Sequence, residues 1–145
     1  MEAKMANGRD LKLILKKVYN HESLVGVDLR NLYLSFINFS GLELRAANLE
    51  GCCLSHALLE DCDLTGANLS NAKLDHASFN RARMTGATVT DAIAAGASFK
   101  GVTGLTPAAK AYLKAKGAKG LEDCVLAPGE PTNGSAAKRS GRLVD

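Results

Sequence analysis

Two histidines and a cysteine carry the side chains most suited to chemistry in this chain. His56 and His76 lie twenty residues apart, and Cys53 comes three residues before His56. Imidazole and thiol groups act as general bases, nucleophiles or zinc ligands. However, third and fourth zinc ligands are not evident, and the four cysteines show no C-x-x-C spacing. The chain also lacks the G-x-S-x-G, phosphate-loop, H-E-x-x-H and dinucleotide-binding motifs. We therefore predict no catalytic residue, no metal and no cofactor.

A five-residue repeat fills the middle of the chain and must position these residues. From Leu29 onward an apolar residue, usually a bulky one, recurs at every fifth position. A second apolar column, which begins at Val27, precedes the first by two positions, and from Ala47 to Ala97 this second column contains only Ala or Cys. The position two residues after the bulky one is often Gly. The bulky column, with its small last members, consists of Leu29, Leu34, Phe39, Leu44, Leu49, Leu54, Leu59, Leu64, Leu69, Leu74, Phe79, Met84, Val89, Ala94, Phe99 and Gly104.

This period predicts a coiled backbone. Five fits neither the period of an α-helix, about 3.6, nor that of a simple strand, about 2. Two residues of every five can point inward only if the backbone turns once per repeat. A quarter-turn per repeat closes a square coil of about twenty residues, and parallel hydrogen bonds stack successive coils about 4.8 Å apart. The repeats between Val27 and Gly104 predict about four such coils.

The segments ANLEG, CDLTG and ANLSN resemble the pentapeptide-repeat family. The resemblance extends from Val27 to about Thr103 and implies an all-β solenoid, a right-handed quadrilateral parallel β-helix of about four coils. Some members of that family inhibit or protect DNA gyrase and topoisomerase IV, and resemble duplex DNA in girth and negative charge. The family often dimerises through its C-terminal end, which implies a homodimer through the C-terminal helix as one arrangement.

Residues twenty apart stack in such a coil, so the outward columns can be read from the sequence. One side combines a column of Phe36, His56 and His76 with a column of Tyr33, Cys53, Lys73 and Ile93. Clustered exposed apolar groups mark protein contacts. We interpret these seven residues as candidates for binding a protein partner. The alternative is a solvated column whose members simply stack.

Acidic residues support a second hypothesis. The candidate acidic patch consists of Glu43, Glu50, Glu60, Asp61 and Asp63. In this hypothesis the acidic patch is the DNA-mimicking surface of an inhibitor or protector of DNA gyrase or topoisomerase IV. Arg45, Arg81 and Arg83 interrupt these acids, and four coils make a short rod. The first hypothesis is therefore a non-enzymatic protein–protein interaction module, and DNA mimicry is the alternative.

The flanks of the repeat predict caps. The expected segments are an N-terminal capping helix (1–23), the β-helix (24–105), a C-terminal helix and cap (106–127) and a flexible tail (128–145). The apolar side of the first helix is expected to contain Leu11, Ile14, Leu15 and Val18. The second helix should begin at Pro107 and end near Gly117.

The composition of the chain also predicts its cellular location. Its longest apolar runs are too short for a membrane span, and residues 1–20 lack the apolar block of a signal peptide. The cysteine pattern is typical of reduced thiols. We therefore expect a cytoplasmic protein that contacts neither a membrane nor nucleic acid directly.

Overall fold

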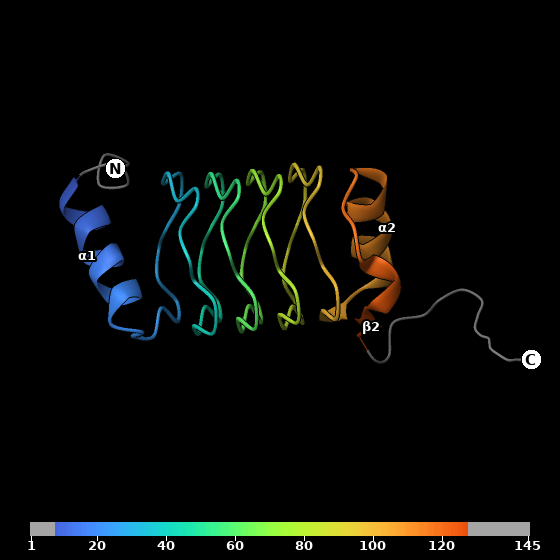
Figure 1. Ribbon diagram of the computed structural model, residues 1–145, viewed down its shortest axis with the longest axis horizontal. Helices are drawn as coiled ribbons and strands as arrows, with labels where there is room; N and C mark the ends of the chain where they lie inside the picture. Colours follow the sequence, from blue (N-terminus) through green and yellow to red (C-terminus); the bar gives the residue numbers. More distant parts are fainter. Residues whose placement is uncertain (1–7, 128–145) are drawn as a thin grey trace, which may run out of the picture.

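A stack of coils lies between two helical ends in the computed structural model, which describes residues 8–127 (Figure 1). The expected tail, 128–145, and residues 1–7 lie outside this described part. The elements in chain order are helix α1 (Gly8–Tyr19), strand β1 (Thr103–Leu105), helix α2 (Pro107–Ala115), 3-10 helix η2 (Leu121–Asp123) and strand β2 (Val125–Leu126). No helix of the described residues is long and apolar enough to cross a membrane.

Single parallel bridges join residues that are twenty positions apart. They begin with Asp28 paired to Asn48 and continue, one every five residues, to Arg83 paired to Thr103. The hydrogen bonds of these bridges run from coil to coil, as where the Leu54 amide donates to the Lys73 carbonyl at 2.8 Å. The bridged residues are thus twenty positions apart, as expected for a coil of twenty residues.

Each corner of a coil has a left-handed backbone. Every fifth residue from Gly26 to Gly101 has a φ between 58° and 80°, whether it is glycine or not. This region favours Gly and is tolerated by Asn, Asp and His, which explains the frequent Gly at this repeat position. The next position in the series, Thr106, has a φ of −75°, so the regular coils end after Gly101.

Aliphatic and phenylalanine side chains fill the interior. Leu54, Leu59 and Leu64 have no exposed surface. The small column lies at the crowded corners, where the buried thiols of Cys52 and Cys62 donate hydrogen bonds to backbone carbonyls. One interior column consists of Phe39, Leu59, Phe79 and Phe99, and the last two rings stack with centroids 4.9 Å apart.

Helix α1 lies against the first coil (Figure 1). Its Ile14 is buried, and Leu11 and Val18 pack against the same core. The expectation that Leu15 belongs to this inner side was wrong, because Leu15 is 40% exposed. Successive helical residues differ by about 100° around the axis, so Leu15 is turned away once Ile14 points at the coil.

Helix α2 and the segment after it close the other end. Thr106 caps α2 by accepting a hydrogen bond from the Ala109 amide at 3.0 Å, and Leu113 is fully buried against the last coil. Beyond α2, the Lys119 amide donates to the Ala97 carbonyl at 2.7 Å, and β2 pairs in parallel with β1. Backbone groups of the last coil are therefore paired at this end.

Candidate protein-binding groove

Three aromatic rings stack along one edge of the solenoid. The Phe36 and His56 ring centroids lie 4.9 Å apart with an interplanar angle of 1°, and those of His56 and His76 lie 5.0 Å apart at 15°. All three residues occupy left-handed corners in successive coils, with φ between 60° and 67°. We call Phe36, His56 and His76 the aromatic ladder.

Gly96 ends the aromatic ladder. It occupies the next corner, with a φ of 73°, and a Cβ there would lie 2.6 Å from Nδ1 of His76. The His76 ring thus covers the Gly96 backbone, and a side chain at this position would require the ring to move. The ladder therefore contains three rings and then gives way to bare backbone.

A groove runs beside the aromatic ladder. It has a volume of about 910 Å³, and the described residues lining it are Tyr33, Ser35, Phe36, Cys53, Ser55, Lys73, Asp75, His76, Ile93 and Ala95. The structure therefore brings together all seven residues predicted as a binding face, with His56 stacked between Phe36 and His76. The prediction missed the column of Ser35, Ser55, Asp75 and Ala95 between the two predicted columns, although the same twenty-residue spacing could have found it.

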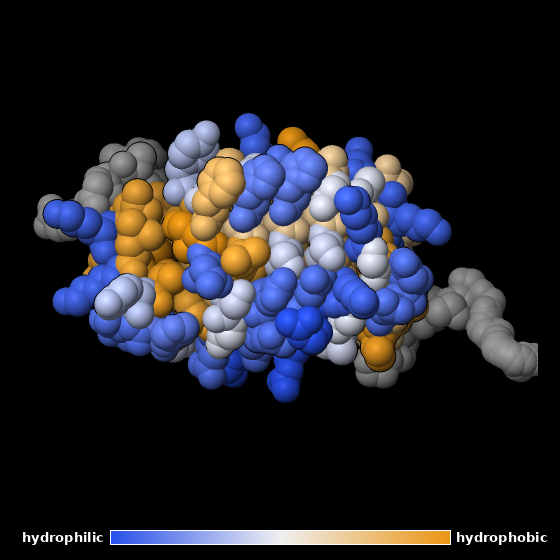
Figure 2. Space-filling view, in the orientation of Figure 1, coloured by the Kyte–Doolittle hydropathy of each residue, from blue (hydrophilic) through white to orange (hydrophobic). Residues whose placement is uncertain are grey.

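Large apolar side chains are exposed along the groove. Tyr33 is 79% exposed, Phe36 74% and Ile93 50%. Leu58, which the sequence did not single out, adds an exposed side chain on the next side. Figure 2 shows hydrophobic residues gathered over α1 and the first coils, whereas the later coils are mainly hydrophilic on this face. On this face the exposed apolar surface is thus concentrated towards the N-terminal end.

Polar groups link the coils along the groove. The Cys53 Sγ lies 3.0 Å from the Ser35 Oγ and 3.7 Å from the Ser55 Oγ, and Ser55 donates to Asp75 Oδ1 at 2.7 Å. Burial by itself would raise the pKa of the Cys53 thiol, but the hydrogen bonds with Ser35 and Ser55 and the charge of Lys73 together lower it. Cys53 is therefore the thiol with the greatest thiolate character among the four.

This difference predicts selective alkylation of the native protein. Burial raises the pKa of Cys52 to about 12 and that of Cys62 to about 11, and it raises the pKa of Cys124 as well. Because the thiolate is the nucleophile, iodoacetamide at pH 7 should modify Cys53 more than about tenfold faster than the other cysteines. A time course followed by peptide mass spectrometry measures these rates.

The Ser35→Ala variant is the matched comparison. It removes a hydrogen bond that lowers the pKa of Cys53, so alkylation of Cys53 at pH 7 should slow while that of Cys124 is unchanged. In denaturant all four thiols should react at similar rates. Equal reactivity of Cys53 and Cys124 in the folded protein would contradict the assignment.

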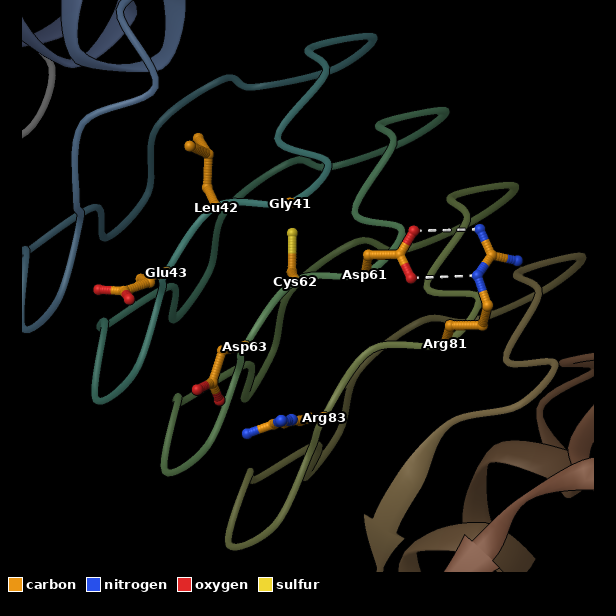
Figure 3. Close-up of a pocket in the computed structure, with 8 residues that line it drawn as sticks. All are labelled: Gly41, Leu42, Glu43, Asp61, Cys62, Asp63, Arg81 and Arg83. Carbon is orange, nitrogen blue, oxygen red and sulfur yellow. Dashed lines mark hydrogen bonds and ion pairs between the residues drawn. The ribbon is translucent and has the colours of Figure 1, made fainter.

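The candidate acids are largely paired with arginines. Arg81 contacts Asp61 at 3.1 Å and Glu60 at 3.5 Å, and Arg45 lies 3.6 Å from both Glu43 and Asp63. Figure 3 shows the Asp61–Arg81 pair beside a pocket of about 480 Å³. The fifth acid, Glu50, lies on another side, in the coil beneath Arg30. The five acids therefore do not form one unneutralised face.

The negative charge of Asp63 is likewise compensated by neighbouring groups. Burial would raise the pKa of this carboxyl group, but hydrogen bonds from the Thr65 hydroxyl and amide, and the charges of Arg45 and Arg83, lower it. Its negative charge is thus stabilised within the protein.

Among the described residues, no group of three or more His, Cys, Asp or Glu side chains could hold a metal ion.

The repeat and its coils define the class of protein. The family model "Pentapeptide repeats" matches residues 23–61 and 62–101, with eight copies. The chain therefore belongs to the pentapeptide-repeat family, and this membership implies a right-handed β-helix. Comparison with curated proteins returned no match.

Solved structures similar to this chain are also pentapeptide-repeat proteins. One from the Arabidopsis thaliana thylakoid lumen is 30% identical over 64% of this chain and 74% of its own, with a TM-score of 0.38. A protein involved in heterocyst differentiation regulation in the cyanobacterium Nostoc is 26% identical over 62% of this chain and 45% of its own, with a TM-score of 0.26. QnrB1, a plasmid-mediated fluoroquinolone resistance protein, is 17% identical over 55% of this chain and 68% of its own, with a TM-score of 0.20.

Proposed function

We propose that this protein is a non-enzymatic protein–protein interaction module, and that it binds and modulates its partner through the groove beside the aromatic ladder. In this proposal the scaffold is a right-handed quadrilateral β-helix of about four coils, and the partner is a cytoplasmic protein. The four cysteines are free thiols, which suits a reducing compartment.

The observation that carries the proposal is the exposed aromatic side chain of Phe36 at a left-handed corner. This bulky residue has a φ of 67° and yet exposes 74% of its side chain. A left-handed conformation costs a residue with a Cβ about 1–2 kcal/mol relative to the right-handed region. Asn31 and Asn71 fill equivalent corners with a residue better suited to this conformation. Backbone strain combined with an exposed aromatic ring is typical of a binding site.

The neighbours of Phe36 prepare it for binding. Its ring stacks on His56, so the side chain is held in one orientation before a partner arrives. A pre-ordered aromatic side chain loses less conformational entropy on association, which leaves more of the contact energy as affinity. Tyr33 and Ile93 offer further apolar surface along the same groove.

The Phe36→Asn variant tests this proposal. Asn removes the ring but suits the left-handed corner, so the melting temperature should stay the same or rise. Truncation of an aromatic anchor costs about 2 kcal/mol or more, so affinity for the partner should fall about 30-fold or more. A photo-crosslinker attached to Cys53 captures the partner, and titration calorimetry with the purified partner then measures the affinity.

A corner on another side supplies the matched control. Asp91 is exposed and has a φ of 58°, so Asp91→Asn makes a small change at the same repeat position away from the groove. This variant should bind the partner as tightly as the unaltered protein. If Phe36→Asn keeps full affinity while folded, the groove is not the interface.

DNA mimicry of the kind that inhibits or protects DNA gyrase or topoisomerase IV is the alternative proposal, and the site geometry supports it less. Such a mimic presents uncompensated negative charge, whereas Arg45 and Arg81 pair with four of the five candidate acids. A homodimer through α2 would use the side of this helix that faces away from the last coil, because Leu113 is buried against the protein's own core. The exposed residues there are Ala108, Ala111, Lys114 and Ala115.

A further inference from the structure

Lysines gather around a small pocket at the C-terminal end of the solenoid. The pocket has a volume of about 340 Å³, and its described lining includes Lys110 and Lys114 from α2, Lys119, and Glu122 as its single acid. Lys100 adjoins this pocket, because a Cβ on the pocket residue Gly120 would lie 3.1 Å from the Lys100 Cα. We call Lys100, Lys110, Lys114 and Lys119 the lysine cap.

The charges of the lysine cap are not neutralised by ion pairs within residues 8–127. The ion pairs of that part of the chain involve Lys17 of α1 and three arginines of the coils, Arg30, Arg45 and Arg81. Lys100, Lys114 and Lys119 are exposed, and Lys110 is half-buried. The cationic groups are thus free to meet an external anion.

The described residues at this end carry an excess of positive charge. Residues 100–127 contain five Lys and Arg against two Asp and Glu, whereas residues 8–99 contain nine against ten. Clustered positive charge on one part of a surface is the electrostatic footprint of a polyanion-binding protein. The modest net charge of +3 conceals this separation.

We propose that the lysine cap binds the phosphate backbone of duplex nucleic acid without reading its sequence. Lysine is a compact point charge that suits phosphate, and Lys110 and Lys114 lie one helical turn apart on α2. The one aromatic residue of α2, Tyr112, is not free to stack on bases. Its hydroxyl donates to the Ala92 carbonyl at 2.9 Å, and Lys116 Nζ lies 5.5 Å from its ring centroid. This proposal departs from the expectation of no direct nucleic-acid contact.

The composition of the surface favours nucleic acid over an acidic protein. Protein interfaces are depleted of Lys at their centre and enriched in aromatic residues, whereas nucleic-acid interfaces are strongly positive. The exposed residues of α2 are Ala and Lys. The groove that carries the aromatic ladder runs along all the coils, from Tyr33 to Ala95, whereas the lysine cap lies around the pocket of Lys119 and Gly120.

Fluorescence anisotropy with the full chain and a labelled duplex of about 20 base pairs tests the proposal. Each neutralised phosphate contributes about −0.9 to the slope of log K against log salt concentration, so four lysines predict a slope between about −3 and −4. The Lys110→Gln, Lys114→Gln, Lys119→Gln triple variant should bind about tenfold or more weakly at about 50 mM salt, with a slope near −1. Thermal melting verifies that the variant is folded.

The control removes the same charge from the other end of the solenoid. A Lys12→Gln, Lys16→Gln, Lys17→Gln variant of α1 should retain duplex binding, because these lysines lie outside the lysine cap. Poly-glutamate of matched charge and vesicles of phosphatidylserine should bind more weakly than the duplex. Absence of duplex binding at about 50 mM salt, equal loss in both triple variants, or tighter binding of poly-glutamate or vesicles would each overturn the proposal. Full retention of binding in the lysine-cap variant would do so too.

Discussion

Replacing Leu59 by Ala is expected to lower the free energy of unfolding by about 2–5 kcal/mol. Leu59 has no exposed surface and lies in the interior column between Phe39 and Phe79. Bridges above and below it, from Leu58 to Asn38 and to Ser78, fix the spacing of the three coils. The neighbouring coils cannot collapse into the space that the lost methyl groups leave, so the cavity persists.

Urea denaturation of Leu59→Ala beside Thr90→Ala measures this effect. Thr90 is exposed, and its side chain makes no hydrogen bond within the described residues, so its replacement should change the unfolding free energy by no more than about 0.5 kcal/mol. Ser55 is a poorer control, because its hydroxyl donates to Asp75 at 2.7 Å. Similar costs for Leu59 and Thr90 would mean that the assignment of inward and outward positions is wrong.

Gly104→Ala is expected to destabilise the protein by about 2–5 kcal/mol, the sum of two separate penalties. The residue has a φ of 89°, a conformation that L side chains rarely adopt. A Cβ would also lie 2.5 Å from the amide nitrogen and 2.7 Å from the Cα of Thr85, and backbone atoms cannot rotate away as a flexible side chain can. Either the β1 segment or the coil beneath it must shift.

Gly41→Ala separates the two penalties. Gly41 has a similar φ of 80°, but a Cβ there would meet no atom within 4 Å. Its replacement should therefore cost only the conformational term, about 1–2 kcal/mol. Thermal or urea unfolding of both variants gives the comparison. If Gly41→Ala is as costly as Gly104→Ala, the close approach to Thr85 contributes nothing to stability.

The five-residue period by itself determined which side chains point inward and which columns share a side. It placed Cys52 and Cys62 in the small inward column, and both are buried. It also placed Phe36, His56 and His76 in one outward column, and their rings stack. The physical reason is that each repeat must bury two of its five residues, so a coil of twenty residues repeats the same orientation at every fourth repeat.

Only the tertiary structure decided how neighbouring columns interact and how the repeat ends. The Asp61–Arg81 pair and the hydrogen bond from Ser55 to Asp75 depend on the length and rotamer of each side chain, which the period does not specify. At the ends the repeat stops, so no periodic signal predicted that Leu15 would be exposed or that Gly104 would meet the backbone of Thr85. Periodicity specifies the direction of a side chain, whereas its partners depend on the atoms that the folded coils and caps bring within contact distance.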